Sequence, residues 1–467
     1  MGTIAEQINY LAETKTAIKD ALVAKGVSVA DSDTFRSYAE KIGEIQSGGG
    51  ESGGGSAAVV EKDVNFRDYD GTILYSYTKS QFLALSSLPE LPTQKGLICQ
   101  GWNYSFEDAK NYVSLYGILE VGANYITDDG KTRFYIKIAD KGRMEVPIRF
   151  NQSVSNGVVI DWGDGSATQT ISGTSSTIIT HKYEDVGNYC ITLNPQDDCI
   201  IYLAGSTSVG AMGAITDSNY VYQSMLRRVE YGKNITMLHT YAFCYCQALE
   251  AVSIPQNMTN VGAHAFDYCR SLRYLALPKN MTKINTYAFN YCSIQNISIP
   301  KSISAIDSYA FSNCTALRKA IMPGVTSIAD YAFQTCEALS EVIMPNNISS
   351  ISASAFYQCK AMTRVVMPQG LTSIKATAFR YCKSLPCVVM PKGVTSIASN
   401  AFSNCTSMAF YDFSNHASVP SLTSGAFASM PTDCKIVVPD SLYDSWIAAA
   451  NWSTYASQII KASEYNG

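Results

Sequence analysis

The feature that most constrains this chain is a repeat that runs from Tyr241 to Pro439. The dipeptide Ala-Phe recurs at steps of 22 or 23 residues, with its aromatic residue at Phe243, Phe266, Phe289, Phe311, Phe333, Phe356, Phe379 and Phe402. Repeats of this length build solenoids in which each repeat is one coil. Because one coil cannot bury its apolar face alone, the sequence predicts stacked coils with a cap at each end.

Within each repeat, apolar residues alternate before a proline, as Val252 and Ile254 do before Pro255. Such alternation predicts a strand with these residues and Leu249 turned inward. Proline lacks the N–H that a sheet needs, so it ends the strand. Later repeats carry the same mark at Pro278, Pro300, Pro323, Pro345, Pro368 and Pro391.

The full pattern reads A-F-x-x-C-x-x-L-x-x-[VI]-x-[ILM]-P-x-x-[IVLM]-[TS]-x-[IV] over residues 216–412. It resembles the BspA-type leucine-rich repeats of bacterial surface proteins and of tailed phages. The resemblance implies a leucine-rich-repeat solenoid. This sequence differs from the commoner leucine-rich consensus because its cysteine precedes the strand and no asparagine ladder follows it.

A cysteine stands three residues after each Phe, at Cys246, Cys269, Cys292, Cys314, Cys336, Cys359, Cys382 and Cys405. Three interpretations are open: a metal array, a staircase of disulfides, or small core residues. Stacked coils lie about 4.8 Å apart, whereas bridged Cβ atoms lie about 3.8 Å apart. A metal site needs paired ligands, and each repeat supplies one thiol. We therefore favour reduced core cysteines, no metal site and no cofactor.

Before the repeats, residues 161–166 read D-W-G-D-G-S and residues 181–189 read H-K-Y-E-D-V-G-N-Y. Both marks resemble polycystic-kidney-disease-type (PKD) domains, which implies an immunoglobulin-like sandwich over 144–215. Asp161 and Asp164 could hold calcium. The favoured alternative is that they accept backbone hydrogen bonds in tight turns.

Residues 1–47 predict two short amphipathic helices, and residues 48–56 read G-G-G-E-S-G-G-G-S, which is a flexible tether. The helices resemble N-terminal segments of phage fibre and tail-associated proteins. This resemblance implies an anchor to other virion proteins, and the apolar seam favours a homo-oligomer. The predicted anchor residues are Ile4, Ile8, Leu11, Ile18, Leu22, Phe35, Tyr38 and Ile42.

Residues 57–143 predict an α+β domain. We expect hairpins over Val64–Tyr77 and Tyr125–Ile138 and a helix from a Ser105 cap to Tyr116. At the other end, residues 413–467 depart from the repeat and predict a helical cap around Trp446 and Trp452. The predicted fold class is multidomain and mainly β: a helical anchor, the α+β domain, an immunoglobulin-like (PKD) sandwich, a leucine-rich-repeat solenoid and a C-terminal helical cap.

Composition excludes several function classes. The net charge is −4 with 35 basic and 39 acidic residues, so no nucleic-acid footprint is expected. No apolar run approaches the roughly 20 residues of a membrane span, and Met1–Leu22 lacks the pattern of a signal peptide. No catalytic motif accompanies the four histidines. We expect a non-enzymatic protein, assembled in a host cytoplasm, that acts outside cells.

These resemblances imply a phage virion protein that displays its solenoid for recognition of a host-surface protein or glycan. Two alternatives stay open: a bacterial cell-surface adhesin with the same repeats, and a tail-associated enzyme that degrades glycans.

Two columns of side chains are the candidate binding residues. The first lies midway along each strand, faces away from the core and contains the apolar residues Ile321, Ile343, Val366 and Val389. The second lies two residues before each Phe and contains Tyr241, His264, Tyr287, Tyr309 and Tyr331. An exposed apolar stripe often marks a contact between subunits, and tyrosines suit a receptor surface. The alternative is that the first column only favours strand and that the tyrosines pack along the turns.

Overall fold

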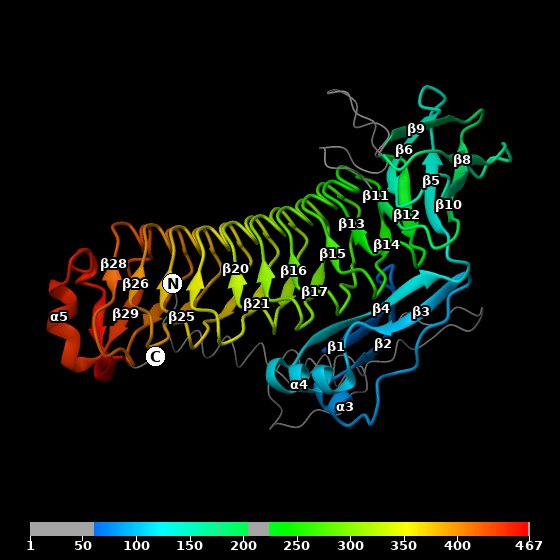
Figure 1. Ribbon diagram of the computed structural model, residues 1–467. Helices are drawn as coiled ribbons and strands as arrows, with labels where there is room; N and C mark the ends of the chain where they lie inside the picture. The colour runs from blue at the N-terminus through cyan, green and yellow to red at the C-terminus, as the bar shows by residue number, and fades with distance from the viewer. Residues whose placement is uncertain (1–59, 176, 204–223, 466–467) are drawn as a thin grey trace, which may run out of the picture. The chain divides into compact units, whose positions relative to one another are not determined.

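The computed structural model describes residues 60–175, 177–203 and 224–465, shown in colour in Figure 1. The predicted anchor and tether, at residues 1–47 and 48–56, lie outside these residues. Within the described part of the chain, none of the helices combines the length and the apolar character that a bilayer crossing requires.

The first described segment is a four-stranded sheet with two helices. Its elements are β1 (Val64–Arg67), β2 (Ile73–Tyr77), α3 (Lys79–Leu83), β3 (Leu97–Trp102), α4 (Phe106–Tyr116) and β4 (Leu119–Thr127). The strand order is β2-β1-β4-β3, and β1 and β2 form the predicted hairpin. The Ser105 hydroxyl accepts the Asp108 N–H at 3.1 Å, so the predicted cap of α4 is confirmed. Gly117, with φ of 82°, ends the helix.

The hairpin predicted over Tyr125–Ile138 is wrong. β4 pairs with β1 and β3, whereas β5 (Thr132–Ile138) pairs with β10 (Gly187–Pro195) and with a strand of the solenoid. The turn at Asp129 and Gly130 therefore connects two different sheets.

Two further sheets form a β-sandwich. One contains β5, β7 (Val158–Asp161), β8 (Gln169–Ile171) and β10, and the other contains β6 (Glu145–Gln152), β9 (Thr177–Lys182) and β11 (Ile201–Leu203). Alternate residues of each strand are buried, such as Phe134 and Ile136 in β5 and Ile148 and Phe150 in β6, and they belong to one core. This alternation is what strands with one buried face require.

From Leu226 the chain winds into stacked coils, which run toward the red C-terminal end in Figure 1. Most coils contribute a strand to each of two parallel ladders, and regular strand pairing is interrupted twice along each ladder. The strands of the first ladder are β12 (Leu226–Glu230), β14 (Ala251–Ser253), β17 (Asn296–Ser298), β19 (Lys319–Ile321), β21 (Glu341–Ile343), β23 (Arg364–Val366), β25 (Cys387–Val389), β27 (Phe410–Asp412) and β29 (Lys435–Val438). The strands of the second are β13 (Met237–Leu238), β15 (Asn260–Val261), β16 (Lys283–Ile284), β18 (Ala305–Ile306), β20 (Ser327–Ile328), β22 (Ser350–Ile351), β24 (Ser373–Ile374), β26 (Ser396–Ile397) and β28 (Ser421–Leu422).

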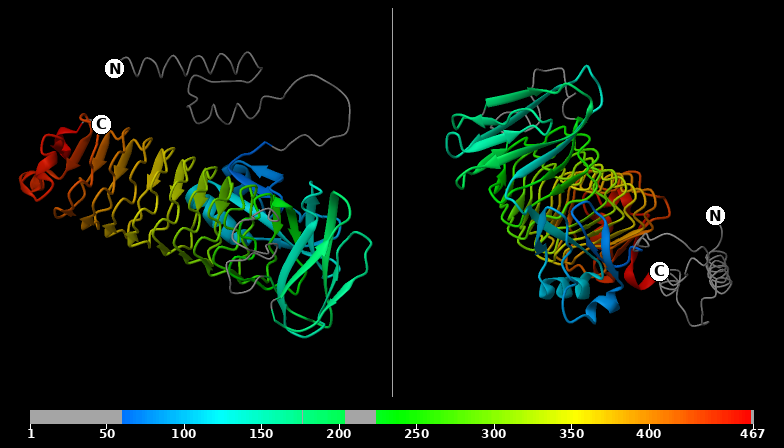
Figure 2. Two further views of the ribbon diagram at one scale, coloured as in Figure 1. Left: turned by 90° about the horizontal axis from the view of Figure 1, so that it is seen from above. Right: turned by 90° about the vertical axis from the view of Figure 1, so that its right-hand side faces the viewer.

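The inner face of the coils is the predicted one. Leu249, Val252 and Ile254 are all at most 1% exposed, and the equivalent residues of later coils are buried in the same core. Seen along the solenoid axis, the coils overlie one another (Figure 2). Each coil therefore buries its apolar face against its neighbours, as the repeat predicts.

The sandwich is the N-terminal cap of the solenoid. β12 pairs antiparallel with β5 of the sandwich and parallel with β14 of the next coil. On the other side, β11 pairs antiparallel with β6 and parallel with β13. Both ladders of the solenoid thus continue hydrogen bonding into the sandwich, so neither ladder ends there in an open edge.

β4 of the α+β segment lies against the outer face of the first coils. The Asn124 side chain donates to the carbonyl oxygens of Ile254, at 2.7 Å, and Ala276, at 3.0 Å. A Cβ atom on Gly122 would lie 2.4 Å from the Ala276 Cβ atom. Only glycine permits this approach, and the coil segment at Ala276 is not itself a regular strand.

The C-terminal cap contains more strand than the sequence predicted. It comprises η2 (Asp440–Leu442), α5 (Tyr443–Ala448), η3 (Ser453–Tyr455), β30 (Ile459–Lys461) and η4 (Ala462–Glu464). Trp446 and Trp452 are fully buried and stack edge to face against Phe413 or each other. β30 extends the first ladder by pairing with β29, so the expected helical cover is one short helix followed by a strand.

Candidate binding surfaces on the solenoid

The turn that carries Ala-Phe has the same backbone geometry in each coil. The residues two before and two after Phe289, which are Tyr287 and Tyr291, both have φ of 56°. These left-handed residues make alternate N–H groups point to the next coil: the N–H of Phe289 donates to Ala310 and that of Tyr291 to Ser312, at 2.9 and 3.0 Å. The turns are thus joined by hydrogen bonds that are separate from the two strand ladders.

A column of stacked phenylalanines fills the turn from inside. Phe311 lies 5.4 Å from Phe289 and from Phe333, with ring planes inclined by 14° and 11°. Beside this column, the thiol of Cys336 donates to the Phe311 carbonyl oxygen at 3.1 Å. The same bond recurs at Cys269, Cys292, Cys314, Cys359, Cys382 and Cys405. Each thiol therefore supplies a second donor to a buried carbonyl of the preceding coil, which also accepts a backbone N–H within its own coil, as Phe311 does from Cys314 at 3.3 Å.

Burial raises the pKa of these thiols; that of Cys314 and that of Cys405 rise to about 12. The thiols are protonated at neutral pH and can act as hydrogen-bond donors.

All fourteen cysteines are free in the structure. Among the described residues, no group of three His, Cys, Asp or Glu is placed to hold a metal ion.

The predicted tyrosine column is a continuous aromatic stack. Ring centroids lie 4.5 Å apart from Tyr241 to His264, 4.6 Å from His264 to Tyr287, 4.5 Å from Tyr287 to Tyr309 and 4.6 Å from Tyr309 to Tyr331. The ring planes are inclined by at most 18°. The three inner rings, His264, Tyr287 and Tyr309, are therefore covered on both faces by their neighbours, and what the half-buried rings present outward is their edges.

The outward edges carry hydroxyl groups. Burial raises the pKa of Tyr287 and Tyr309, so these phenols keep their protons at neutral pH and both donate and accept hydrogen bonds. His264 stands within the stack, and its Nδ1 atom lies 2.8 Å from Asp267 Oδ2. Asp267 also accepts from the Asn290 side chain at 2.9 Å, so the imidazole is fixed in the plane of the column. We name these five residues the aromatic edge.

A second aromatic column, which was not predicted from the sequence, flanks the phenylalanines. Tyr245, Tyr268 and Tyr291 stack at 4.5 and 4.3 Å. The Arg270 guanidinium lies 5.4 Å from the Tyr268 ring and 5.5 Å from the Tyr291 ring, within cation–π range. The signal was available, because all three tyrosines stand two residues after a repeat Phe.

The apolar column does not form the continuous exposed stripe that the sequence predicted. Ile321 and Ile343 are 2% and 6% exposed, whereas Val366 and Val389 are 41% and 56% exposed. Earlier members of the column are buried as well, since Ser253 donates to the Tyr125 carbonyl and Ser298 accepts from the Glu120 N–H of β4. The open part of this face is thus limited to the coils of β23 and β25.

The two aspartates of the sandwich lie in tight turns. Asp161 accepts the Gly163 N–H at 2.9 Å and Asp164 accepts the Ser166 N–H at 3.0 Å, so the favoured turn interpretation is confirmed. Burial opposes ionisation of Asp164, but hydrogen bonds from Ser166 and from His181, whose Nε2 lies 2.7 Å away, lower its pKa to about 2.

Comparison with known families identifies the repeats. Residues 236–363 and 326–444 match the family model of the BspA type leucine rich repeat region, in six copies. A comparison with curated proteins gives no match.

The solved structures similar to this chain include three leucine-rich-repeat proteins. A leucine-rich repeat protein from Bacteroides ovatus is 18% identical, covering 56% of this chain and 71% of its own, with a TM-score of 0.44. A leucine rich cell surface protein from Faecalibacterium prausnitzii is 26% identical over 47% of this chain and 67% of its own, with a TM-score of 0.33. The leucine rich repeat protein of T. pallidum is 21% identical over 53% of this chain and 86% of its own, with a TM-score of 0.30. No enzyme family is indicated, and the family match establishes that the solenoid is built from BspA-type leucine-rich repeats.

Proposed function

We propose that this chain is a non-enzymatic recognition protein whose solenoid binds a protein or glycan on a cell surface. The observation that carries the proposal is the aromatic edge, in which phenol and imidazole edges repeat about every 4.5 Å along one side of the coils. The stack and the backbone bonds of the turns fix these groups before a partner arrives. Binding then costs little side-chain entropy, which favours affinity.

A pair of tyrosines tests this surface. Tyr309→Phe with Tyr331→Phe removes two hydroxyl groups and keeps both rings in the stack. We expect labelled protein to lose at least tenfold in affinity for its target cells, because edge-on contacts depend on the hydroxyls. The matched control is Tyr75→Phe with Tyr77→Phe on β2, which removes two half-buried phenols elsewhere. Equal binding by both double variants contradicts the assignment.

At a finer level we propose that the protein belongs to a phage particle and that residues 1–47 anchor it there as a homo-oligomer. The support is the resemblance of this segment to phage fibre proteins and the glycine tether that follows it. Mass spectrometry of purified particles tests the location, and deletion of residues 3–45 tests the anchor. We expect the truncated protein to be folded but missing from particles. Normal incorporation of the truncated protein would exclude the anchor.

The second candidate is a bacterial cell-surface adhesin, because BspA-type repeats occur in bacterial surface proteins as well. Cell fractionation separates the two: an adhesin is recovered with the envelope of uninfected cells, whereas a virion protein appears only with phage. For the remaining alternative, a glycan-degrading enzyme, neither the motifs nor the family match provide support.

We also propose that the sandwich is a PKD-type spacer. The support is the W-G-D-G turn and the H-x-Y mark: Trp162 and Tyr183 are buried, and the Tyr183 hydroxyl donates to the Trp162 carbonyl at 2.7 Å. Calcium titration of the full chain, followed by thermal unfolding, tests the turn role. We expect no shift of the unfolding temperature on addition of calcium.

A further inference from the structure

The hydrogen bonds that join the turns reach an end at the last coil. Each earlier repeat Phe donates its N–H to the following coil, up to Phe402, which donates to Ala426 at 2.8 Å. Two residues later, Asn404 donates to Ala428 at 2.8 Å. The next turn is that of Phe427, and in the described residues after it the chain forms the C-terminal cap and not another Ala-Phe turn. The Phe427 N–H donates instead to the Tyr455 hydroxyl oxygen at 3.3 Å.

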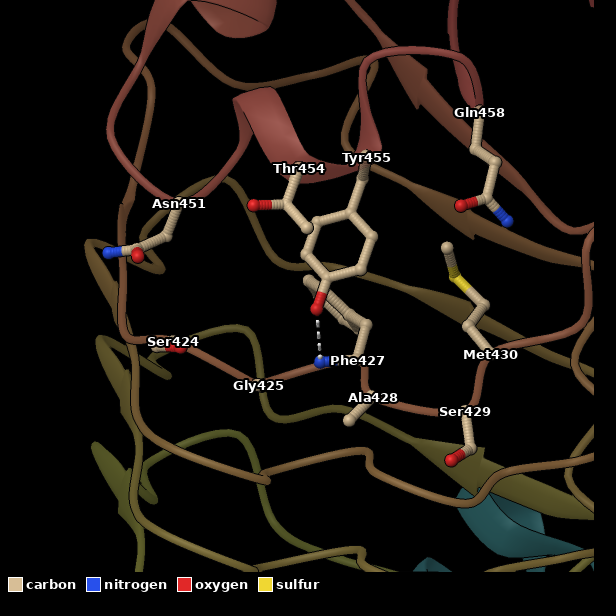
Figure 3. A pocket seen from close by; sticks show the side chains of 10 residues that line it. All are labelled: Ser424, Gly425, Phe427, Ala428, Ser429, Met430, Asn451, Thr454, Tyr455 and Gln458. Atoms are coloured by element: carbon tan, nitrogen blue, oxygen red, sulfur yellow. Dashed lines mark hydrogen bonds between the residues drawn. The ribbon is translucent and has the colours of Figure 1, made fainter.

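The turn of Phe427 lines a cavity of about 400 Å³ (Figure 3). Ser429 is the counterpart of Asn404, and it is left-handed, with φ of 60°. Gly425 stands two residues before Phe427 and has φ of 76°. Within the described part of the chain, no acceptor meets the N–H of Ser429 or of Gly425. Both residues line the cavity.

The Tyr455 hydroxyl adds another donor. Its oxygen accepts from Phe427, so its own proton is left for a ligand. Burial raises the pKa of Tyr455, which keeps this proton in place at neutral pH.

The cavity also presents acceptors and an apolar wall, but no charge. The amide nitrogens of Asn451 and Gln458 donate to backbone carbonyls of Leu422 and Pro431 at 2.7 and 2.8 Å. Their amide oxygens are therefore available as acceptors. Phe427, Ala428 and Met430 form the apolar part of the lining, and the ten described residues that line the cavity include no Asp, Glu, Lys, Arg or His.

Fixed donors, amide acceptors and an apolar wall without a charge match the chemistry of a neutral sugar. A ring hydroxyl both donates and accepts, and the C–H face of the ring is apolar. A carboxylate or phosphate would find donors here but no counter-charge. We propose that this cavity, at the C-terminal end of the solenoid, binds a neutral hexose or N-acetylhexosamine residue of a surface glycan. The inference rests on the proposed recognition function and names a ligand class for it.

Saturation-transfer NMR and calorimetry on the full chain test the inference, with glucose, galactose, N-acetylglucosamine and N-acetylgalactosamine as probes. We expect at least one sugar to bind with a Kd on the order of 1 mM, as the size of a monosaccharide allows. Thr454→Trp, at an exposed residue of the rim, should fill the cavity and weaken binding at least tenfold. The matched control is Thr395→Trp, at an exposed threonine elsewhere on the solenoid, and it should bind as the natural chain does.

The inference would be overturned by the absence of binding of all four sugars, or by equal binding of a sugar to Thr454→Trp. Binding of acetate in preference to the sugars would do so too, since it would identify an anion site. A measurement of binding to target cells distinguishes failure of the cavity assignment from failure of the proposed recognition function. If the chain binds cells but not sugars, the recognition function stands and the cavity assignment fails. If it binds neither, both fail.

Discussion

The Cys314 Sγ atom lies 3.1 Å from the carbonyl oxygen of Phe289 in the preceding coil. This relationship gives the cysteine column a function that a purely apolar residue could not perform. The Phe289 carbonyl also accepts the Cys292 N–H at 3.3 Å, so the thiol supplies a second hydrogen bond to this buried oxygen. A thiol is small enough to stay in the core and still supplies a donor.

The thiol bond predicts an effect on stability. Cys314→Ala removes one of the two donors to the Phe289 carbonyl, which keeps the Cys292 N–H at 3.3 Å, so we expect a loss of about 0.5 to 1.5 kcal/mol in the free energy of unfolding from the lost hydrogen bond. Urea unfolding followed by circular dichroism measures it. The control is Cys387→Ala, at a half-buried cysteine outside the column, for which we expect a smaller loss. Equal losses at the two positions would mean that the thiol bond contributes nothing beyond packing.

The same thiols predict a loss of stability at alkaline pH. Burial raises the pKa of Cys314 from 9.0 to about 12. Above pH 9 the unfolded chain therefore releases protons that the folded chain keeps, so stability falls as the pH rises from about 9 to about 12. The unfolding temperature between pH 7 and pH 11 measures this. Replacing Cys314 and Cys405 together by Ala should flatten the alkaline part of the curve.

Free thiols also predict the redox state. Denatured protein measured under non-reducing conditions should have the mass of a chain with fourteen free cysteines, since each is free in the structure. In the folded state, alkylation should be limited to the half-buried Cys99, Cys190 and Cys387, because the other eleven cysteines are buried out of reach of the reagent. Several bridges along the column would contradict the prediction.

The sequence was sufficient where one short pattern decides the structure. The repeat period and Pro255 with its equivalents predicted the coils, their strands and the buried Val252 and Ile254 correctly, because these depend on neighbours at a fixed spacing. The failures concern partners that are distant in sequence. Turn signals at Asp129 and Gly130 suggest a hairpin, but whether β4 and β5 pair is decided by the sheets that compete for them.

The candidate surfaces show the same difference between features that the repeat spacing predicts and features that depend on the folded surroundings. The position of Tyr309 in a column follows from the period, but its left-handed backbone does not, because tyrosine has no preference for that region. The ring faces are consequently covered by stacking, which spacing alone could not reveal. Ile321 faces away from the solenoid core as the alternation predicts, yet it is buried.

The sandwich turn predicts different costs of substitution for its two glycines, which are separated by one residue. Both Gly163 and Gly165 are left-handed, with φ of 78° and 83°. Gly165→Ala meets no atom within 4 Å and should cost about 1 to 2 kcal/mol from the backbone alone. A Cβ atom at Gly163 would lie 2.4 Å from the Cys190 carbonyl oxygen, so Gly163→Ala should cost about 1 to 3 kcal/mol more. Thermal unfolding of the two variants measures their relative stability. A larger loss for Gly165→Ala than for Gly163→Ala would show that the turn has a different structure.

The last prediction concerns the contact between β4 and the solenoid, where Asn124 takes the place of a strand partner. Its side-chain amide donates to both Ile254 and Ala276 and its oxygen accepts from Gln256 at 2.6 Å, all in a fully buried position. Asn124→Ala leaves these groups unsatisfied, so we expect a loss of about 2 to 5 kcal/mol.

Hydrogen exchange measured by mass spectrometry gives the local readout for Asn124→Ala. Exchange should accelerate in peptides that cover β4 and residues 274–277, whereas peptides from the coils of β25 and β27 should be unchanged. Asn188→Ala, at an exposed position of β10, is the matched control and should stay within about 0.5 kcal/mol of the natural chain. In a solenoid each coil is stabilised mainly by its nearest neighbours, so the loss of a local contact should not affect distant coils. Uniform acceleration of hydrogen exchange along the whole solenoid would therefore mean that Asn124 supports global stability and not this contact.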